Sequence, residues 1–595
     1  MALIVQKYGG SSVANPERIK AVSDRVIRTV ALGNQVIVVV SAMGKTTDGL
    51  LKLAQEVGLG ADHSISEREL DLLLATGEQV TTCLLAICLQ SQGQGAIALN
   101  ANQIKIITEP QHNRARILNI ENHRISQFLD QGKVVIVAGF QGIATGTEEF
   151  TTLGRGGSDT SAVAIAAALQ ADLCEIYTDV PGILTTDPNL VSDAQLMTEI
   201  TCDEMLELAS LGAKVLHPRA VEIARNFGVK MAVRSSWLED PGTTVISPEI
   251  ITGDRRALET SGFVQAVMVD SHQVKMALLQ VPDQPGIAAQ LFTALAAKGI
   301  NVDLIVQSIQ DLADQKAQDQ AKEHRELNDI AFTIPPQDWQ LAEAVIQALD
   351  LGAESVLVDN LVAKISIVGA GIVGRPGIAA QMFTALSRAG INIQMISTSE
   401  VKLSCVIAQA DCEAAIACLT KSFQVSLTTQ ISSLISQRPV TGVALDRHRA
   451  RLAVRQVPDQ PGVAAQLFQY LADQGVSVDM IVQSQSDQGL NDIAFTVAIA
   501  DLVKAETSLK QIAPKLGCGV VIADGEIAKV SIVGAGMMQQ SGVAARMFQS
   551  LADLGINIEM IATSEIKVSC VIRESRAIEA VQKIHQDFNL GKRVV

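Results

Sequence analysis

The chain has 595 residues, of which 48% are hydrophobic and 18% charged. This composition indicates a packed globular protein of about four domains and excludes a disordered chain. The formal net charge of −16 argues against nucleic acid or an anionic membrane as the main partner.

The same composition sets expectations about location and metals. No apolar run approaches the ~20 residues that a membrane span needs, and no signal peptide precedes the first strand, so we expect a cytoplasmic protein. The nine cysteines are scattered without a C-x-x-C pair, which predicts reduced thiols. The eight histidines form no ligand-spaced cluster with them, so no protein-bound metal is predicted.

Residues 1–240 alternate short Val/Ile-rich runs with helical segments, as in "ALIVQKYGG", "NQVIVVVSAMG", "KVVIVAGFQG" and "LCEIYTDVPG". Nearly continuous apolar runs between helices are typical of a buried parallel sheet. We therefore predict an α/β domain, with a mostly parallel open sheet and helices on both faces.

Four glycine-rich turns follow these runs: "KYGGSS", "SAMGKTTDG", "GFQGIATG" and "TTLGRGGSDT". Ligands of open α/β sheets lie beyond the carboxyl ends of the strands, so we expect all four turns at one edge. Glycines there let backbone amides approach phosphate oxygens, and the helix that "GRGGSDT" opens adds an anion site. No G-x-x-x-x-G-K-[ST] motif is present, which excludes a P-loop NTPase.

Seven ordered motifs in this half resemble aspartokinase, of the amino-acid kinase fold. They are "KYGGSSV", "VVSAMGKTTDGL", "ATGEQ", "AGFQG", "TLGRGGSDTSA", "YTDVPGILTTDP" and "GAKVLHPRAVE". The resemblance covers residues 1–245, which we predict to be the catalytic domain. It implies transfer of the ATP γ-phosphoryl group to the side-chain carboxylate of L-aspartate, with Mg²⁺ bound mainly through phosphate oxygens.

A carboxylate acceptor needs no general base, so the chemical problem is repulsion between two anions. The resemblance implies three sets of residues. The catalytic set is Lys7, Asp159 and Lys214, with Asp159 orienting the lysines and not abstracting a proton. The aspartate-binding set is Ser41, Thr47, Glu78, Arg155 and Ser158, with Arg155 on the α-carboxylate and Glu78 on the α-ammonium. The ATP-binding set is Lys7, Gly9, Gly10, Ser11, Gly156, Gly157, Thr178, Asp179, Leu184, Asp187 and Lys214.

Two other residues of this half are set aside. His217 precedes Pro218 at an expected helix start, where capping is its expected role. Cys174 lies in an apolar strand and is expected in the core.

The second half is built from repeats. "VPDQPGIAAQLFTALAAKGINVDLIVQS" (281–308) returns at 457–484 with 20 of 28 positions identical, and the stretch 364–407 returns at 529–572. The G-x-G-x-x-G of Gly369, Gly371 and Gly374 resembles a dinucleotide fingerprint, but its twin has Gln539 at the third position. No acidic residue follows where a ribose contact would lie, so a Rossmann unit is disfavoured.

Each repeat shows a β-α-β-β-α-β order, the ferredoxin-like pattern, with a stop glycine after its first helix. Four such units in phase resemble ACT domains, the small-molecule-sensing modules of amino-acid metabolism. The predicted bounds are 262–350, 360–438, 440–518 and 523–595. Most aspartokinases carry two ACT units, so four leave the number of effector sites open. We expect the first unit to pair with the second and the third with the fourth.

The resemblance implies lysine and threonine as effectors, bound where paired units meet. Glycines at the strand-to-helix turns permit close approach, and the first helical turn offers N–H groups to a carboxylate. The predicted effector residues are Asp283, Gly286, Ile287, Ala288, Gln307, Asn328, Asp329, Asn392, Ile393, Asp459, Gly462, Val463, Ala464, Gln483, Asn491, Asp492, Asn557 and Ile558. For Asp283 and Asp459, plain turn formation remains an equal alternative.

Two alternative functions stay open. Another amino-acid kinase, acting on glutamate, acetylglutamate or a nucleotide, would share the fold, and a non-catalytic amino-acid sensor would bind ligands without turnover. A kinase fused to homoserine dehydrogenase is disfavoured, because repeats fill the second half. ACT units tend to pair edge to edge, so a homodimer is expected.

Overall fold

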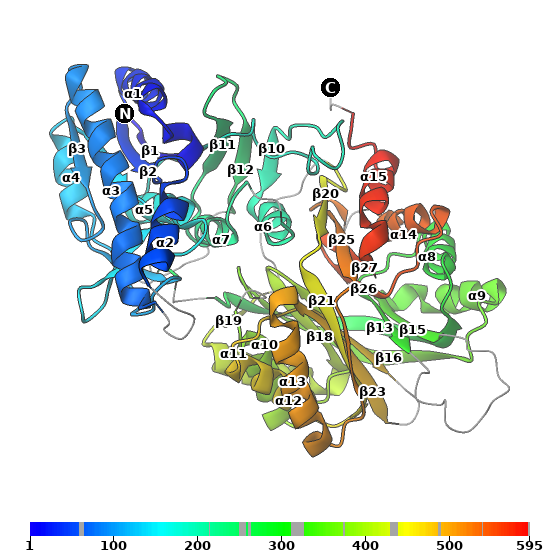
Figure 1. The fold of residues 1–595 in the computed structure, drawn as a ribbon. Helices are drawn as coiled ribbons and strands as arrows, with labels where there is room; N and C mark the ends of the chain where they lie inside the picture. The colour runs from blue at the N-terminus through cyan, green and yellow to red at the C-terminus, as the bar shows by residue number, and fades with distance from the viewer. Residues whose placement is uncertain are drawn as a thin grey trace. The chain divides into compact units, whose positions relative to one another are not determined.

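The computed structural model describes residues 1–58, 65–212, 215–248, 258–259, 263–310, 327–372, 375–428, 438–485, 489–537 and 540–592. The chain divides into two compact units (Figure 1). The first comprises Met1–Leu184 and Leu196–Gly262, and the second comprises Thr185–Gln195 and Phe263–Val595. The segment Thr185–Gln195, called the strap below, therefore belongs to the second unit although the chain on both sides of it belongs to the first.

The first unit is built on the open sheet that the sequence predicts. Its strand order is β10-β12-β11-β9-β1-β2-β6-β3, and every pairing is parallel except that of β11 with β12. Its strands are β1 (Leu3–Tyr8), β2 (Gln35–Val40), β3 (Ala96–Leu99), β6 (Val134–Ala138), β9 (Leu173–Thr178), β10 (Glu199–Thr201), β11 (Met231–Ser235) and β12 (Thr243–Ile246). The strands β2 and β6 are buried over nearly their whole length, as their apolar runs require.

A smaller sheet lies beside this one in the same unit, in the order β5-β4-β7-β8. Its strands are β4 (Ile106–Thr108), β5 (Ile117–Ile120), β7 (Gln141–Ala144) and β8 (Phe150–Thr152). The middle of the third predicted turn, 139–146, is therefore strand β7, and only the residues before 141 and after 144 form turns. The helices of the unit are α1 (Pro16–Ala31), α2 (Thr46–Val57), α3 (Glu67–Ser91), α4 (His123–Asp130), α5 (Gly157–Leu169), α6 (Cys202–Ser210) and α7 (Pro218–Phe227), with a 3-10 turn, η1 (Gly10–Val13).

Helix α3 is long and apolar enough to pass a membrane-span test by length and composition. Half of its most apolar window is buried inside the protein, and the helix buries Asp71 and Glu78. Helix α3 therefore packs into the core of the first unit, and its two buried carboxylates are polar groups held inside that core.

The second unit contains four ferredoxin-like repeats. The first repeat is β13 (Ala266–Pro282), α8 (Ile287–Ala297), β14 (Ile305–Gln310), β15 (Leu327–Ile334), α9 (Trp339–Leu349) and the start of β16 (Ser355–Val368). The second continues along β16 with α10 (Ile378–Arg388), β17 (Met395–Ser399), β18 (Lys402–Ala408), α11 (Cys412–Phe423) and β19 (Ser426–Thr428). Strand β16 begins past the predicted end of the first repeat at residue 350 and serves both repeats.

The third and fourth repeats follow β20 (Gly442–Asp446). The third is β21 (Arg449–Pro458), α12 (Val463–Asp473), β22 (Val478–Gln485), β23 (Leu490–Ala498), α13 (Leu502–Ile512) and β24 (Val521–Asp524). The fourth is β25 (Ile527–Val533), α14 (Val543–Asp553), β26 (Met560–Ser564), β27 (Lys567–Arg573) and α15 (Ala577–Asp587). Short 3-10 turns lie at Pro336–Asp338, Gln409–Asp411, Ile499–Asp501, Ala513–Leu516 and Glu574–Arg576.

The helices of these repeats end where the sequence predicts. The residues that follow α8, α10, α12 and α14 are Gly299, Gly390, Gly475 and Gly555, and all four have φ between 65° and 74°. This left-handed conformation is the one that glycine adopts without strain at a helix end.

The repeats pair in a different way from the one predicted. Strand β14 of the first repeat hydrogen-bonds with β26 of the fourth, and Phe292 of α8 packs against Phe548 of α14 with ring centroids 5.5 Å apart. The second repeat meets the third in the same manner, through Phe383 and Phe468. The expected pairing of first with second and third with fourth is therefore wrong. The first and second repeats are instead neighbours in one sheet, joined through β13 and β16.

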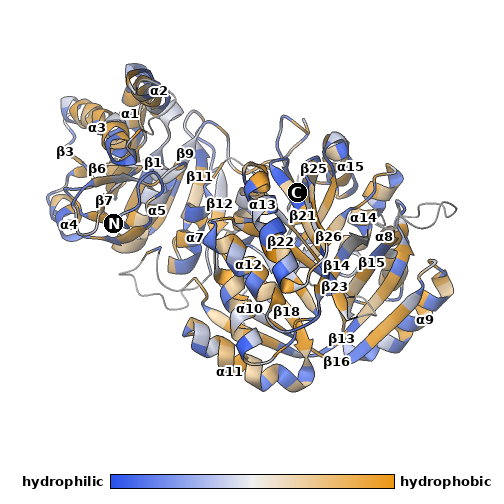
Figure 2. Cartoon of the chain, turned by 60° about the horizontal axis from the view of Figure 1, so that its bottom comes forward, coloured by the Kyte–Doolittle hydropathy of each residue, from blue (hydrophilic) through white to orange (hydrophobic). Residues whose placement is uncertain are grey.

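Each pair of repeats forms a continuous apolar core beneath its helices. The helices above these cores are amphipathic. In Figure 2, α9, α11 and α13 each carry both hydrophilic and hydrophobic residues. Such amphipathic helices bury one face against the sheet.

Candidate active site and regulatory sites

Lys7 lies next to the last residue of strand β1, at the carboxyl edge of the large sheet. Its Nζ forms an ion pair of 2.6 Å with Asp159 Oδ1, and both side chains are only 11% exposed. Asp159 lies in the first turn of α5, so one ion pair joins the strand end to the start of that helix. A buried carboxylate so close to Lys7 fixes the position of the ammonium group.

Glu78 reaches the same edge from α3. Its Oε1 accepts a hydrogen bond from the backbone N–H of Ala42, just beyond β2, at 3.0 Å. Its Oε2 is buried and has no hydrogen-bond partner within the described chain. Burial raises the pKa of Glu78 to about 7, although the bond from Ala42 opposes the shift. A cation brought to Oε2 would favour the ionised form.

Glycines keep this edge accessible to a ligand. A Cβ placed on Gly9 would lie 3.3 Å from Lys7 Nζ, and one on Gly139 would lie 2.9 Å from Ser158 Oγ. Gly156 has φ +68°, and a Cβ there would lie 2.3 Å from the Cβ of His217. Backbone therefore approaches Lys7 and the N-terminus of α5 more closely than any side chain would allow.

The structure brings part of the predicted site together and leaves part apart. The residues gathered at the ends of β1, β2 and β6 and at the start of α5 are Lys7, Gly9, Gly10, Ser41, Glu78, Gly156, Gly157, Ser158 and Asp159. Ser11 and Arg155 lie exposed beside them, and Thr47 is half-buried near the start of α2. Lys214 lies outside the described residues.

The predicted nucleotide segment is divided between the two units. Thr178 ends β9 and Asp179 follows it, with Thr178 Oγ1 donating to Asp179 Oδ1 at 3.1 Å. Leu184 ends this part of the first unit. Asp187 lies in the strap, where it accepts hydrogen bonds from the backbone and side chain of Asn189.

The predictions for His217 and Cys174 are confirmed. His217 accepts a hydrogen bond from the backbone N–H of Arg219 and caps α7. Cys174 is fully buried, and burial raises the pKa of its thiol far above the usual range.

Sequence reasoning missed Asp71, which supports the site from α3. This fully buried carboxylate accepts from the backbone N–H and hydroxyl of Thr152 and from the backbone N–H of Asn113, and it contacts His112. It ties α3, and with it Glu78, to the smaller sheet. An acidic residue two turns before Glu78 was the available signal.

The predicted effector residues form two equivalent sites, one in each pair of repeats. In the Asp283 site, Asp283 Oδ1 accepts from the amides of Asn328 at 2.6 Å and of Asn557 at 2.9 Å. In the Asp459 site, Asp459 Oδ1 accepts from Asn491 and Asn392, both at 2.9 Å. The other predicted residues that line these sites are Gly286, Ile287, Ala288, Gln307, Ile558, Ile393, Gly462, Ala464 and Gln483.

Both sites present buried acceptors that lack donors among the described residues. They are Asp283 Oδ2, Gln307 Oε1 and Asn328 Oδ1 in the first site, and Gln483 Oε1 and Asn491 Oδ1 in the second. Each cavity measures about 20 Å³, little more than the space of one water. The arrangement suits an ammonium donor, and a larger ligand would require the pair to open.

Asp329 and Asp492 do not face these sites, in contrast to the prediction. Asp329 accepts from the backbone of Gln280, and Asp492 pairs with Arg455. Successive residues of a strand point to opposite faces, so the residue after each site asparagine turns away. Val463 packs into the core of its pair.

Lys275 also belongs near the Asp459 site and was missed. Burial lowers its pKa to about 8, with Asp359 and Asp459 opposing the shift. Its Nζ donates to Gln394 Oε1 at 3.3 Å. The equivalent position in the third repeat is Arg451, so alignment of the repeats could have drawn attention to it.

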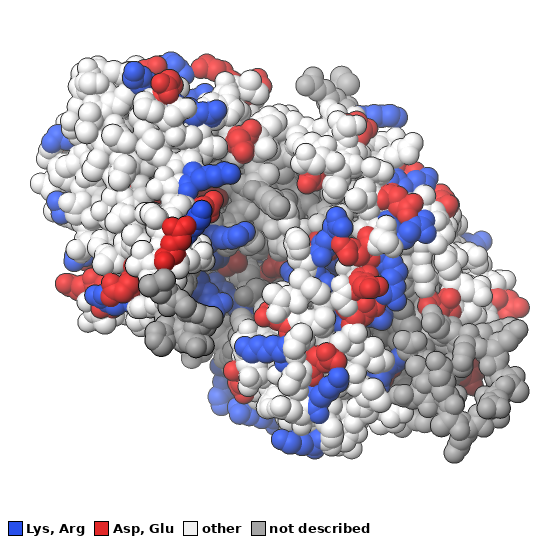
Figure 3. All heavy atoms as spheres, viewed as in Figure 1, with Lys and Arg blue, Asp and Glu red and all other residues white. Residues whose placement is uncertain are grey.

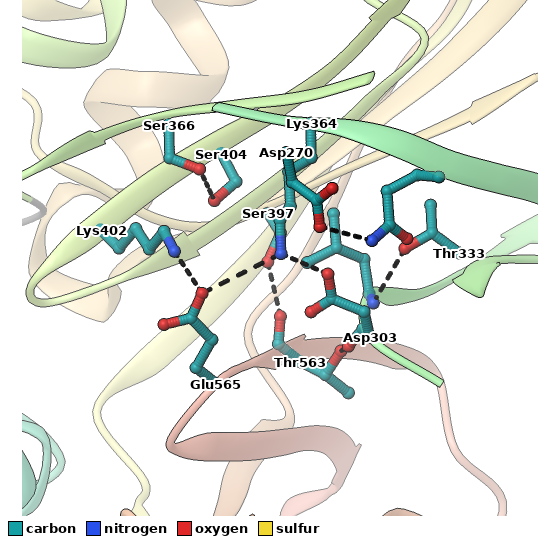
Figure 4. A network of polar contacts seen from close by, with 12 residues as sticks. Asp270, Asp303, Thr333, Lys364, Ser366, Ser397, Lys402, Ser404, Thr563 and Glu565 are labelled. Carbon is teal, nitrogen blue, oxygen red and sulfur yellow. Dashed lines mark hydrogen bonds and ion pairs between the residues drawn. The ribbon is translucent and has the colours of Figure 1, made fainter. Parts of the chain in front are cut away.

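A separate cavity of about 570 Å³ lies between the first and fourth repeats. Its charged lining consists of Asp270, Lys364 and Lys402 from strands and of Asp303 and Glu565 from the segments beside strands, and Figure 4 shows these side chains gathered together. Lys364 pairs with Asp303 and lies 3.9 Å from Glu565, which pairs with Lys402. Three carboxylates thus face two ammonium groups.

Gln273 completes this cavity. It is 7% exposed, and its Nε2 donates to Asp270 Oδ2 at 2.7 Å. Gln273 also lines the cavity, and its Oε1 has no hydrogen-bond partner in the part of the chain that the structure describes. The cavity therefore holds one excess negative charge and one unused acceptor.

Comparison with known proteins supports the reading of both units. The amino acid kinase family model matches residues 2–235, and ACT domain models match 275–315, 365–423, 451–514 and 530–588. The crystal structure of the aspartate kinase from Synechocystis has 51% sequence identity and a TM-score of 0.85, with full coverage of both chains.

Curated relatives agree with this match. An aspartokinase of Corynebacterium glutamicum is 42% identical over 427 residues, which is 71% of this chain and 96% of the relative. An aspartokinase of Geobacillus stearothermophilus is 47% identical over 407 residues, which is 68% of this chain and 93% of the relative. With this identity over nearly the whole length of such relatives, the chain belongs to the aspartokinase family.

Proposed function

We propose that the first unit transfers the γ-phosphoryl group of ATP to the β-carboxylate of L-aspartate. The observation that carries this proposal is the buried Lys7–Asp159 pair beside glycines at the carboxyl edge of the sheet. The acceptor carboxylate is already a nucleophile at neutral pH, so the site must overcome repulsion between two anions. Lys7 and the amides at the start of α5 supply positive potential where charge collects.

ATP fits this edge through its phosphates. Lys7 Nζ, the backbone at Gly9 and Gly10, and the N-terminus of α5 at Gly156 and Gly157 would hold them. Among the described residues, no group of three or more His, Cys, Asp or Glu could hold a metal. Mg²⁺ would then be bound mainly through phosphate oxygens, where it neutralises charge on the donor.

Glu78 would bind the α-ammonium group of aspartate through its unpaired Oε2. Arg155, exposed at the turn before α5, would bind the α-carboxylate in a bidentate manner. Ser41, Thr47 and Ser158 would donate hydrogen bonds to the substrate. These contacts would distinguish an amino acid from other carboxylates.

A phosphotransfer assay with a panel of acceptors tests the proposal. We expect aspartyl phosphate from ATP and aspartate, with little turnover of glutamate, acetylglutamate or nucleoside monophosphates. Lys7→Ala should reduce kcat by about 10³-fold or more, since it removes a preorganised charge at the phosphates. The Lys20→Ala variant, changed on the exposed face of α1, is the matched control. Turnover that survives Lys7→Ala would contradict this phosphate site, and effector binding without turnover in the wild type would indicate a sensor.

We also propose that lysine and threonine inhibit the enzyme through the second unit. The Asp283 and Asp459 sites suit the α-ammonium group of a compact amino acid, because their unused groups are acceptors. Threonine is the effector assigned to them. An effector that binds the active and the inhibited state equally well does not change their populations. Because each cavity measures only about 20 Å³, we propose that the effector binds a state in which the pair of repeats is opened.

The 570 Å³ cavity is the proposed place for lysine. It has room for a long side chain, and Asp270, Asp303 and Glu565 outnumber the two lysines beside them. Burial opposes the charged form of Lys364, but Asp303 and Glu565 outweigh this effect and raise its pKa, so Lys364 is charged. A ligand ammonium would balance the remaining negative charge.

Calorimetry with matched ligands tests this assignment. Lysine should bind the full-length protein, whereas norleucine, which has the same chain without the ε-ammonium group, should bind at least about tenfold more weakly. Asp270→Asn should weaken lysine binding and leave threonine binding unchanged. Asp283→Asn and Asp459→Asn should do the reverse. Equal binding of lysine and norleucine would contradict a cation site in the cavity.

A homodimer is proposed on the surface of α3. This helix exposes Leu72, Val80, Leu84 and Ile87 along one side, and the part of the first unit over α3 carries few charged side chains (Figure 3). Light scattering should give a dimer mass for the wild type and a smaller mass for Val80→Glu with Ile87→Glu.

The acidic composition and scattered free cysteines are those of a cytoplasmic enzyme, which we propose as its location.

A further inference from the structure

The charged cluster of the 570 Å³ cavity has an internal copy between the second and third repeats. The repeated sequence shows which residues correspond: "NVDLIVQS" aligns with "SVDMIVQS", "AKISIVGAG" with "AKVSIVGAG", and "TSEVKLSC" with "TSEIKVSC". Asp303, Lys364, Lys402 and Glu565 of the cavity therefore correspond to Asp479, Lys529, Lys567 and Glu400 of the copy. Asp270 corresponds to Asp446 in the same way.

The copy carries arginine at three positions where the cavity does not: Gln273, Ser271 and Gln540 correspond to Arg449, Arg447 and Arg375. Arg447 pairs with Glu574 and Arg375 stacks on Phe263, so Arg449 is the one considered for the cluster itself. "HQVKMALLQVPD" begins at His272 and "HRARLAVRQVPD" begins at His448, so Gln273 stands where the copy has Arg449.

Gln273 donates only to Asp270 and leaves its Oε1 unused. Arg449 instead reaches two carboxylates, with Nε 2.7 Å from Asp446 Oδ2 and an Nη 3.8 Å from Asp479 Oδ2.

This difference changes the charge of the cluster. In the cavity, three carboxylates face two ammonium groups, which leaves one negative charge. In the copy, Arg449 joins Lys529 and Lys567 against Asp446, Asp479 and Glu400, which balances the charges. Although burial alone would raise it, Lys529 and Arg449 hold the pKa of Asp479 well below its usual range.

The available space differs in the same sense. The copy holds a cavity of only about 30 Å³, lined by Gly377, Ala379, Thr398, Phe468 and Val478, and by Arg375 where the large cavity has Gln540. The corresponding residues of the large cavity are Gly542, Ala544, Thr563, Phe292 and Val302. The same arrangement of residues therefore occurs in two forms. The cavity at Gln273 is large and its cluster has an excess negative charge, whereas the copy is small and its cluster contains Arg449.

We propose that Arg449 acts as a built-in ligand, whose guanidinium permanently fills the cation position that the other pair of repeats leaves open. The chain then has one site of this kind that responds to a free cation, and one that is fixed in the occupied state. This proposal deepens the regulation described above and rests on the use of the open cavity by a cationic amino acid. The residue proposed to decide whether the cluster carries its own cation is Gln273 in the open cavity and Arg449 in the copy.

Installing the arginine in the open cavity is the first test. Gln273→Arg should pair with Asp270 and Asp303 in place of a ligand, so calorimetry should show lysine binding weakened by about tenfold or more. Its melting temperature without ligand should rise. Gln273→Met, of similar size and without charge, is the matched control and should retain lysine binding within a few fold. Lysine binding by Gln273→Arg as tight as that of the wild type would overturn the proposal.

Removing the arginine from the copy is the second test, with methylguanidinium as the probe. Arg449→Ala leaves Asp446 and Asp479 with one cation fewer, so its melting temperature should fall. A few millimolar methylguanidinium should restore part of that loss, whereas neutral methylurea should not, and the wild type should respond to neither. If Arg449→Ala does not fold unaided, its recovery on refolding with each compound gives the same comparison. An identical response to both compounds would overturn the proposal.

The two tests distinguish the role of Arg449 from the proposed binding of lysine in the open cavity. If the wild type binds no lysine, the proposed role of the open cavity fails, while the methylguanidinium result still decides whether Arg449 fills a cation site. If Gln273→Arg loses lysine binding but methylguanidinium does not act on Arg449→Ala, the cavity assignment stands and the built-in ligand fails.

Discussion

Glu78 gives the candidate active site its clearest dependence on pH. Burial raises its pKa to about 7, so the free enzyme holds a mixture of protonated and ionised Glu78 near neutral pH. Only the ionised form attracts the substrate ammonium. The KM for aspartate should therefore fall as pH rises from 6 to 8, and Glu78→Gln should raise KM and remove this dependence. Steady-state kinetics across this range at saturating ATP provides the measurement, and an unchanged profile in Glu78→Gln would contradict the assignment.

Gly156 should tolerate no side chain. Its φ of +68° alone costs a non-glycine residue about 1–2 kcal/mol, and a Cβ would also meet His217 at 2.3 Å. Gly33, with φ +83° and nothing within 4 Å of its Cβ position, is the matched control. In thermal unfolding, Gly156→Ala should lose more stability than Gly33→Ala, and only Gly156→Ala should lose activity. Equal losses would show that the contact with His217 relaxes freely.

Residue types alone could identify much of the site. Lys7, Gly9 and the start of α5 follow from a sequence pattern that places strand ends and a helix start at one edge, and the structure joins them. The orientation of side chains within a strand was harder. Asp329 and Asp492 follow the site asparagines directly, and a one-residue alternation sends them to the opposite face.

At the scale of elements, the contact between α8 and α14 holds the first repeat to the fourth. Phe548 is 1% exposed and contacts Phe292, so truncation to alanine should cost about 3–5 kcal/mol. Chemical denaturation should report this loss in the second unit, together with weaker lysine binding. Val503→Ala, changed at a 74% exposed position of α13, should have little effect on either. A small loss in Phe548→Ala would mean that the two helices close over the gap.

The elements themselves were predictable, but their partners were not. Apolar periodicity and stop glycines fix each strand and helix locally, so all four repeats could be traced from sequence. Which edges meet depends on long-range packing. The first and third repeats are near copies, as are the second and fourth, so neither local pattern distinguishes a neighbour in sequence from a neighbour in space.

At the scale of the whole molecule, the strap is the part that sequence reasoning could not anticipate. It leaves the first unit after Leu184, returns at Leu196, and is bound by the fourth repeat between these points. Thr185 Oγ1 lies 3.0 Å from His585 Nε2, the carbonyl oxygen of Thr185 accepts from Val443, and the carbonyl oxygen of Leu190 accepts from Gln582. The segment carries Asp187, so it connects the predicted nucleotide residues to a regulatory helix through the backbone.

His585 should therefore affect inhibition more than catalysis. It is 1% exposed, and its Nδ1 faces Asp193 of the strap at 3.6 Å. In His585→Ala, uninhibited turnover should stay within about twofold of the wild type, while the lysine concentration for half-inhibition should rise severalfold because coupling is lost. Ile578→Ala, at an exposed position of the same helix, is the control. Unchanged inhibition in His585→Ala would exclude the strap as the connection.

The crossed pairing of repeats has a consequence for how the chain can be divided. A break between β19 and β20 would give a front fragment with the first and second repeats and a back fragment with the third and fourth. Each fragment would then hold one half of the Asp283 site and one half of the Asp459 site, because Asp283 meets Asn557 and Asp459 meets Asn392 across that break. The front fragment alone should escape feedback, and adding the back fragment in trans should reinstate it, so the two halves behave as the complementary subunits of a single regulator.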